Sequence, residues 1–571
     1  MNVSYGSVEK EVEGFSFFLT DNSGGFFNYA LESHIYSGLF AYFNDSFRIL
    51  ESITVEGFYP EHVSYFGNYA ELAMGDFKQW LWMPFPSTIV CQLSSERCIR
   101  PFLDVKRAYD NRNWGRYCNF ERMDDVILVE FTKRTDEKED KSHGTEEFRV
   151  YVAIKGAQPV IRNEWAKRLY HNNVNEPPME RYVFLPVEFN AKKIAVAAAK
   201  TPSAAIKLAE LALNTLPNGR NMPHKGEREL AAFYAERALE QLLVGEKVLF
   251  AGLPWFFQDW SRDTAVSIKA LSFRNPESAK NMLLAMVRSF LPDGRLQNKA
   301  GSKEGNADAA GWAFKRIGEL SGLFSARENY IAAQLLEKSI QLMRKNYEKQ
   351  SLICNNAKET WMDTTGGTND SRSGFRIEIQ ALQLSMYALA YKLTKKPEYK
   401  RLEDSLKEKV RKVFWNGRIL ADGKDDWTAR PNIFIAAYAY PELLSKEEWT
   451  ACFENALKEL WLPWGGLASI SKNSPLFVDS YTGSNDRSYH RGDSWFWINN
   501  LAAIVMNRIN RKKFEEYISK IVDASAEEIL WHGALGSHAE LSSAKQLESH
   551  GCLNQAWSDA MFLELIRELG R

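Results

Sequence analysis

From about residue 200 to the C-terminus, one pattern dominates the sequence: apolar residues recur at helical spacing, and no sheet signal interrupts them for long. Segments with this spacing span residues 203–213, 227–243, 307–323, 330–347, 377–393, 399–413, 495–509 and 554–569. With shorter candidates between them, this predicts roughly a dozen helices. No repeat of about 34 to 47 residues is present, which disfavours a solenoid. Long connections rich in Gly and Trp fit an (α/α)6 toroid, and an irregular α-bundle is the alternative.

The N-terminal part has a different pattern, in which short alternating runs are separated by turn signals. Residues 15–19, 126–131 and 149–154 are such runs, and residues 22–25 form a turn signal. At 571 residues the chain also exceeds the size of a single core. We therefore predict an α+β multidomain protein. Its parts are a β-rich, sandwich-like domain over residues 1–200, a linker over 201–224 and an (α/α)6 catalytic domain over 225–571.

Composition excludes several classes of partner. The 72 Lys and Arg residues nearly cancel the 73 Asp and Glu residues, so no basic field is available to attract nucleic acid or anionic lipid. The six cysteines form no CxxC pair, the N-terminus has no apolar leader, and no window approaches a membrane span. We expect a soluble cytoplasmic protein with free thiols.

The first segment with possible chemistry covers residues 252–264 and ends in Trp260-Ser261-Arg262-Asp263-Thr264. Asp263 precedes an apolar run, so it stands where a helix N-cap is expected, and capping alone would explain it. The Arg262 fork and the Trp260 ring suit sugar hydroxyls and sugar faces equally well. Both interpretations stay open on the sequence.

A second segment covers residues 359–367 and continues over 371–382. Asp363 lies between Trp361-Met362 and the flexible Gly366-Gly367 turn. Partial desolvation there would raise the pKa of the Asp363 carboxyl and keep it protonated near neutrality, as a general acid requires. A surface loop aspartate is the alternative.

The third region comprises residues 489–497, 532–542 and 551–558, with Glu540 on a loop before a helix that starts near Asn554. Glycoside hydrolysis needs one carboxylic acid to protonate the leaving oxygen and one carboxylate to activate water or attack the anomeric carbon. Asp363 and Glu540 are the natural pair for these two roles.

Other catalytic chemistries lack their motifs. The sequence has no HExxH, Walker loop, nucleotide-type GxGxxG or GxSxG. His532, His538, His550 and Cys552 cluster, but their spacing matches no zinc pattern. No metal or other cofactor is expected.

In these segments the chain resembles the amylo-α-1,6-glucosidase family of glycogen debranching enzymes, and more distantly glucoamylases and trehalases. The similar motifs occur in the family's order over residues 225–571. They are residues 252–264, 360–363, 372–379, 489–497 and 555–558. Residues 18–25 are similar to the opening of the bacterial and archaeal type, whose first domain is β-rich.

The resemblance implies a glycoside hydrolase that releases glucose from α-1,6 branches of an α-glucan with inversion. It implies Asp363 as general acid and Glu540 as general base. It implies substrate contacts from Trp260, Arg262, Asp263, Trp361, Arg372, Glu378, His490 and Trp495. The chain departs from the family pattern at Ser261, Ile377, Arg491 and Asp493. Two alternatives remain, an exo-α-glucosidase of glucoamylase or trehalase type on the same scaffold, and a non-catalytic glycan-binding protein.

Overall fold

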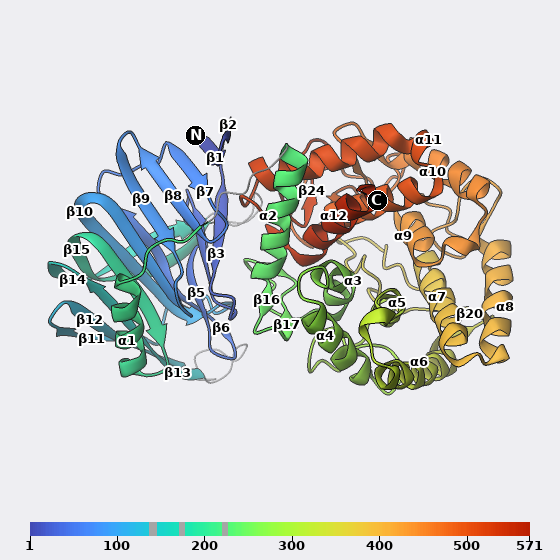
Figure 1. The fold of residues 1–571 in the computed structure, drawn as a ribbon, viewed down its shortest axis with the longest axis horizontal. Coiled ribbons are helices and arrows are strands. Elements are labelled where there is room, and N and C mark those ends of the chain that lie inside the picture. Colours follow the sequence, from blue (N-terminus) through green and yellow to red (C-terminus); the bar gives the residue numbers. More distant parts are fainter. Residues whose placement is uncertain (136–145, 171–177, 220–225, 571) are drawn as a thin grey trace. The chain divides into compact units, whose positions relative to one another are not determined.

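The computed structural model describes residues 1–135, 146–170, 178–219 and 226–570. Two compact units make up the chain. Unit 1 contains Met1–Lys225, Leu243–Gly245 and Trp531–Gly536, and unit 2 contains Gly226–Leu242, Glu246–Leu530 and Ser537–Arg571. Unit 1 is β-rich and unit 2 is helical (Figure 1), which confirms the predicted fold class.

Unit 1 is built around one extensive sheet, in which β10 and β15 are the longest of the described strands. The strands are β1 (Asn2–Tyr5), β2 (Val8–Glu11), β3 (Ser16–Thr20), β4 (Phe26–Ala30), β5 (Gly38–Tyr42), β6 (Ser46–Val55), β7 (His62–Tyr65), β8 (Tyr69–Met74), β9 (Phe77–Trp82), β10 (Thr88–Arg107), β11 (Arg116–Met123), β12 (Val126–Thr135), β13 (Glu146–Gly156), β14 (Pro159–Tyr170) and β15 (Met179–Ala199).

The long strands β10 and β15 change partners along their length. The first half of β10 pairs with β9, from which β8, β7, β1 and β2 continue, and its second half pairs with β6, from which β5, β4 and β3 continue. Register shifts after Gln92 and Ile99 mark the irregular stretches of β10. Such bulges bend a strand, so one strand can serve two sets of neighbours.

Helix α1 (Pro202–Leu213) falls within the predicted linker, yet it packs on the sheet of unit 1. Its small buried residues Ala205, Ala209 and Ala212 are spaced four and three apart and face Ala153, Ala195 and Ala197 of the strands. Residues 220–224 of that linker lie outside the described residues.

Unit 2 contains the remaining helices. They are α2 (Glu227–Gln241), α3 (Ser261–Leu271), α4 (Pro276–Arg288), α5 (Ala309–Glu319), α6 (Ala326–Tyr347), α7 (Ile377–Thr394), α8 (Pro397–Phe414), α9 (Asn432–Ala439), α10 (Lys446–Leu460), α11 (Phe496–Trp531) and α12 (Ala556–Leu569). Helix α11 is two helices joined at a kink, because Asn510 has non-helical dihedral angles (φ −157°, ψ 73°).

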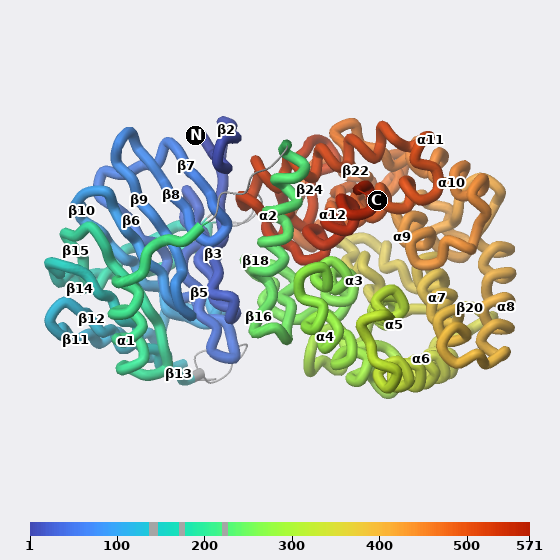
Figure 2. The backbone as a smooth tube through the Cα atoms, viewed as in Figure 1, coloured from blue at the N-terminus to red at the C-terminus, as the bar shows by residue number. Residues whose placement is uncertain are grey.

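These helices form an inner and an outer ring. In the inner ring α3 contacts α12 and α5, α5 contacts α7, and α7 contacts α9. The first half of α11 completes this ring, since Trp497 packs against Trp312 of α5 and Trp557 of α12. Helices α2, α4, α6, α8, α10 and the second half of α11 lie outside, and the tube in Figure 2 alternates between the two rings. This is the predicted (α/α)6 toroid.

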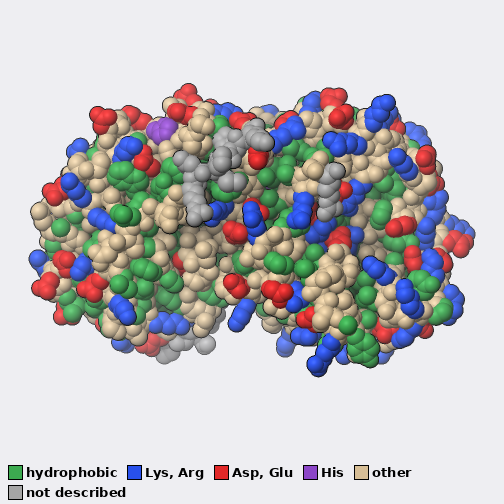
Figure 3. Space-filling view, in the orientation of Figure 1, with side chains coloured by type: hydrophobic (Ala, Val, Ile, Leu, Met, Phe, Trp, Pro, Cys, Tyr) green, Lys and Arg blue, Asp and Glu red, His purple; other side chains and the backbone are tan. Residues whose placement is uncertain are grey.

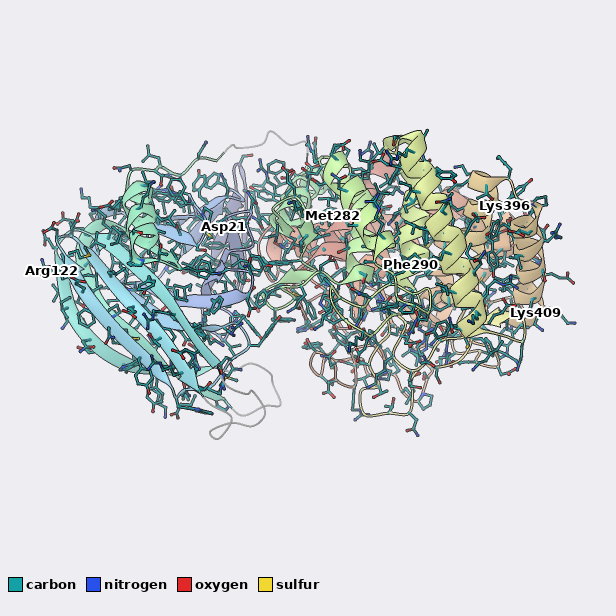
Figure 4. All side chains as sticks on the ribbon, turned by 90° about the horizontal axis from the view of Figure 1, so that it is seen from below. Asp21, Arg122, Met282, Phe290, Lys396 and Lys409 are labelled. Carbon is teal, nitrogen blue, oxygen red and sulfur yellow. The ribbon has the colours of Figure 1, made fainter. Side chains whose placement is uncertain are left out.

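The two rings differ in which helix faces they bury. Inner helix α7 buries residues on every side, including the polar Glu378, Gln380 and Gln383. Outer helix α8 buries only Tyr399, Glu403, Leu406, Val410 and Phe414, spaced three or four residues apart on one face. Lys396 and Lys409 mark this outer helix at the edge of the unit (Figure 4). An amphipathic stripe therefore specifies an outer helix, and burial all round specifies an inner one.

A buried ion cluster fills the toroid near the C-terminal ends of the inner helices. The Glu564 carboxylate of α12 accepts from Arg316 Nη2 and the Tyr438 hydroxyl, both at 2.7 Å, and lies 2.9 Å from Lys269 Nζ. Cations are favoured at helix C-termini. Loops occupy the opposite end of the toroid, where the inner helices begin.

Acidic and basic side chains are interspersed on the face shown in Figure 3, consistent with a net charge of −1. Among the described residues, no helix is long and apolar enough to cross a membrane. The six cysteines are all free, with Cys118 and Cys354 half-buried and the others buried.

Candidate active site

The candidate site lies where the inner helices of unit 2 begin. Two short strand pairs hold the loops there: β18 (Gly252–Leu253) pairs with β25 (Asn554–Gln555), and β23 (Ser494–Trp495) pairs with β24 (Leu541–Ser542). Inner helices α3, α5, α7, α9 and α12 have no side-chain cap. Their positive dipole ends therefore favour carboxylates at this end of the toroid.

Asp363 is the more accessible carboxyl of the predicted pair. Its side chain is 37% exposed, with Oδ2 3.4 Å from Arg262 Nη1 and Oδ1 3.5 Å from His490 Nε2. Burial acts to raise the pKa of Asp363, but His490 and the Arg262 guanidinium favour the ionised form, and the net effect lowers it. The expectation of a raised pKa was wrong because its neighbours in sequence are apolar whereas its neighbours in space are cationic or hydrogen-bonding.

Glu540 is almost fully buried and held at both oxygens. The Tyr489 hydroxyl donates to Oε1 at 2.5 Å, and the backbone N–H of Cys552 donates to Oε2 at 3.0 Å. Burial raises the pKa of Glu540 to about 7, although these two hydrogen bonds lower it and Asp363 adds a smaller upward contribution. Gly551 is required beside it, because a Cβ there would lie 2.2 Å from Oε2 and its φ is +68°.

Tyr489 and His490 bring the two predicted catalytic carboxyls together. These consecutive residues contact Glu540 and Asp363 respectively. Burial lowers the pKa of His490 to about 4, so its ring is neutral at physiological pH. Its Nε2 faces Asp363 Oδ1 at 3.5 Å, and within the part of the chain that the structure describes its Nδ1 has no hydrogen-bond partner. A buried ring nitrogen without a partner suits an incoming hydroxyl group.

The loop before α3 supplies the cationic side of the site. Arg262 Nε donates to both oxygens of Asp308, at 2.9 and 2.8 Å, which fixes the guanidinium beside Asp363. Asp263 does not cap α3, whose N-cap residue is Trp260; it lies in the first turn. There Asp263 Oδ1 accepts from Gln555 Nε2 at 3.0 Å, and burial raises its pKa to about 8 despite Arg262. Trp260 is half-buried.

Arg372 and Glu378 lie in a buried ion cluster with Asp422. Arg372 donates to both carboxylates, at 2.8 Å to Glu378 Oε1 and 2.9 Å to Asp422 Oδ1, and to Thr360 Oγ1 at 2.8 Å. Its φ of +48° is left-handed, which these bonds sustain. Because its donors are already engaged, Arg372 organises the loop before α7. Its contact with substrate stays a prediction.

Trp361 and Trp495 are 2% exposed and pack around His490. The Trp495 ring stacks on the His490 ring at 4.9 Å, and Trp361 meets it edge-on at 5.5 Å. Their indole N–H groups donate inside the protein, Trp495 to the Tyr489 carbonyl at 2.7 Å and Trp361 to Asn432 Oδ1 at 2.6 Å. Both rings therefore fix the orientation of His490.

The structure brings most predicted residues into one region, and it adds Asp308, Asp422 and Tyr489, which sequence reasoning did not select. Tyr489 lay within a noted motif, so the motif was a usable signal. Asp308 and Asp422 are single acids in loops, and only their arginine partners in space reveal them. No group of three or more His, Cys, Asp or Glu side chains suited to a metal ion occurs in the described ranges.

Comparison with solved structures identifies the same architecture elsewhere. A bacterial glucoamylase complexed with acarbose is similar over 98% of this chain and 95% of its own, with a TM-score of 0.60 and 12% identity. A wild-type glycosidase is similar over 60% of this chain and 97% of its own, at a TM-score of 0.46 and 11% identity. At this identity the glucoamylase likeness establishes the fold.

Comparison with sequences identifies the family. No curated protein matches the chain. The family model described as amylo-alpha-1,6-glucosidase matches residues 239–564, which is more than half of the chain and spans every catalytic and binding residue predicted above. The protein therefore belongs to the amylo-α-1,6-glucosidase family of glycoside hydrolases.

Proposed function

We propose that this glycoside hydrolase releases glucose from α-1,6 branch points of glycogen-like α-glucans, with inversion at the anomeric carbon. The observation that carries the proposal is the meeting of Asp363 and Glu540 at the Tyr489-His490 dipeptide, one carboxyl accessible and the other held by two donors. An inverting glycosidase uses two such carboxyl groups, one on each face of the sugar ring.

Asp363 donates its proton to the glycosidic oxygen as the bond from that oxygen to the anomeric carbon breaks. Water attacks the opposite face of the ring and gives its proton to Glu540, whose Tyr489 and Cys552 bonds orient it. His490 accepts a hydrogen bond from a sugar hydroxyl through its unpartnered Nδ1. Arg262, Asp263 and Trp260 bind the glucosyl residue.

In the free site, Glu540 is the carboxyl that keeps a proton to the higher pH. Glu540 has a pKa of about 7, whereas the pKa of Asp363 is lowered. A bound sugar excludes water from Asp363. The added desolvation opposes the effects of Arg262 and His490 and raises the pKa of Asp363. In this proposal the pair exchanges its single proton on binding, which is the behaviour of coupled carboxyls.

The same pKa difference favours a second assignment, in which Glu540 is the acid and Asp363 the base. Hydrolysis of α-glucosyl fluoride separates the two, because fluoride leaves without protonation. We expect Asp363→Asn to keep activity on the fluoride and lose it on branched dextrin, and Glu540→Gln to lose both. The opposite pattern supports the reversed roles.

The likeness to a glucoamylase supports the alternative of exo-cleavage on the same scaffold. Glucose release from isomaltose-type, maltose-type, trehalose and branched substrates, with the product anomer recorded by NMR, tests the linkage and inversion together. Faster release from maltose-type than from isomaltose-type ends would replace the α-1,6 proposal. Binding of glycogen without any released glucose would indicate a glycan-binding protein.

A further inference from the structure

A polar network lies beside the loop that carries Glu540 and consists of Glu528, His538, Asn500 and Ser549. Glu528 is on the second half of α11, and its side chain and that of His538 are fully buried. Oε2 of Glu528 accepts from His538 Nδ1 at 2.6 Å, and Oε1 accepts from the Ser549 hydroxyl at 2.5 Å. Both oxygens also lie 3.3 Å from the backbone nitrogen of Ala539, which donates to them.

The hydrogen bonds of the network assign one tautomer to His538. Asn500 Nδ2 lies 3.2 Å from His538 Nε2, and the Ser525 hydroxyl donates to Asn500 Oδ1 at 3.0 Å. With Oδ1 accepting, the amide nitrogen of Asn500 donates to Nε2, and the ring proton is on Nδ1, facing Glu528. Each group in the network thus has a partner of the complementary kind.

This network secures the backbone that carries Glu540. The N–H groups of three successive residues are each accepted: His538 by Asp559 Oδ1 at 3.1 Å, Ala539 by Glu528, and Glu540 by the Cys552 carbonyl at 2.8 Å. The Ser549 bond ties Glu528 to the second loop, in which the Cys552 N–H donates to Glu540 Oε2. Glu528 therefore bonds to both loop segments that flank the Glu540 carboxyl.

We infer that Glu528, acting with His538, is a positioning residue that fixes where the Glu540 carboxyl stands relative to the bound sugar. The inference rests on the proposed role of Glu540 as the catalytic base. Burying a carboxylate is costly unless donors surround it, and apolar packing would serve stability at lower cost. A catalytic site must hold its reacting groups in place to within a fraction of an ångström. That requirement explains why the protein keeps a polar network here.

Three substitutions test the inference, with one matched control. Glu528→Gln keeps the shape but replaces an acceptor by a donor. His538→Gln removes the donor to Glu528, whereas His538→Asn keeps an amide nitrogen close to the Nδ1 position. Glu564→Gln is the control, because Glu564 is an equally buried carboxylate held by Arg316 and Tyr438 near the C-terminal ends of the inner helices.

We expect Glu528→Gln and His538→Gln to lower kcat by about 100-fold with KM changed only a few-fold, since misplacement by about 1 Å costs this much. The acidic limb of the pH profile, which reports Glu540, should shift in both variants. His538→Asn should recover most of the loss. Glu564→Gln should lower the melting temperature without moving kcat or the limb. Equal effects from Glu528→Gln and Glu564→Gln would overturn the inference.

Crystal structures of Glu528→Gln and Glu564→Gln provide a readout that does not depend on activity. The inference requires Glu540 to lose its bonds to Tyr489 or Cys552 in the first variant and to keep both in the second. Retention of both bonds in Glu528→Gln overturns it. The two proposals can also fail separately. If Glu528→Gln loses these Glu540 bonds but the wild-type protein releases no glucose, the positioning role is upheld and the proposed function is rejected.

Discussion

The hydroxyl of Tyr489 donates a 2.5 Å hydrogen bond to Oε1 of Glu540, and both groups are buried. Burial raises the pKa of Glu540 to about 7, and this bond opposes the rise because it favours the ionised carboxyl. The proposed base is thus poised near neutrality by two opposing effects of its surroundings.

Replacing Tyr489 by Phe removes one of the two hydrogen bonds that lower this pKa and leaves the burial that raises it. The pKa of Glu540 should rise above about 7, and the acidic limb of the kcat/KM profile should move up by about one to two pH units. Tyr481→Phe is the control, since the Tyr481 hydroxyl bonds with Ser484. A limb that moves down or stays fixed in Tyr489→Phe would show that Glu540 does not govern it.

Gly551→Ala tests the close approach of the backbone to Glu540. A Cβ at this position would lie 2.2 Å from Oε2, so the carboxyl must move and kcat should fall by about 100-fold. Gly417→Ala carries a similar left-handed penalty of about 1–2 kcal/mol at φ +88°, but its Cβ would meet nothing within 4 Å. Similar kcat values in the two variants would contradict a requirement for space beside Glu540.

The sequence predicted helices well where apolar spacing is regular. The expected helices over residues 377–393 and 399–413 match α7 (Ile377–Thr394) and α8 (Pro397–Phe414) to within two residues. Inner helices are buried on every side and outer helices on one face only. The spacing of the apolar residues in the sequence predicts this difference. The kink at Asn510 and the exchange of partners along β10 have no comparable periodic signal.

The chemistry of the site was less accessible from the sequence. Asp363 and Glu540 interact electrostatically in the structure and their catalytic roles stay a prediction, but the pKa of Asp363 was predicted in the wrong direction. Its direction depends on Arg262 and His490, each more than a hundred residues away in the chain. The neighbouring residues in the sequence indicate whether a carboxyl is desolvated. Its ionic partners come from distant parts of the chain and become neighbours only when the toroid folds.

Arg372→Met tests the buried cluster before α7. It would leave Glu378 and Asp422 without their shared cation, and we expect a loss of about 3–5 kcal/mol in the free energy of unfolding. Arg508→Met breaks a partly exposed pair with Glu568 and should cost less than about 1 kcal/mol. Urea denaturation measures both. A small loss for Arg372→Met with a large rise in KM would instead indicate direct contact with substrate.

The pH dependence of stability tests the buried carboxyl of Asp493. Burial raises its pKa to about 8, although the Ser488 hydroxyl bond lowers it, whereas in the unfolded chain the pKa is about 4. The folded chain therefore keeps a proton that the unfolded chain releases between these values. The stability that this proton provides is complete below about pH 4 and is lost as the pH rises through about 8.

Asp493→Asn cannot release this proton, so its free energy of unfolding should fall less steeply with pH than that of the wild type. The difference in slope should be about 1.4 kcal/mol per pH unit between about pH 6.5 and 7.5. That window lies above the ordinary pKa of histidine, where His490 and His34, with pKa values lowered to about 4, no longer act in the opposite direction. Parallel slopes in urea denaturation would show that Asp493 is already ionised in the folded protein, and hence that water or a cation reaches this end of the toroid.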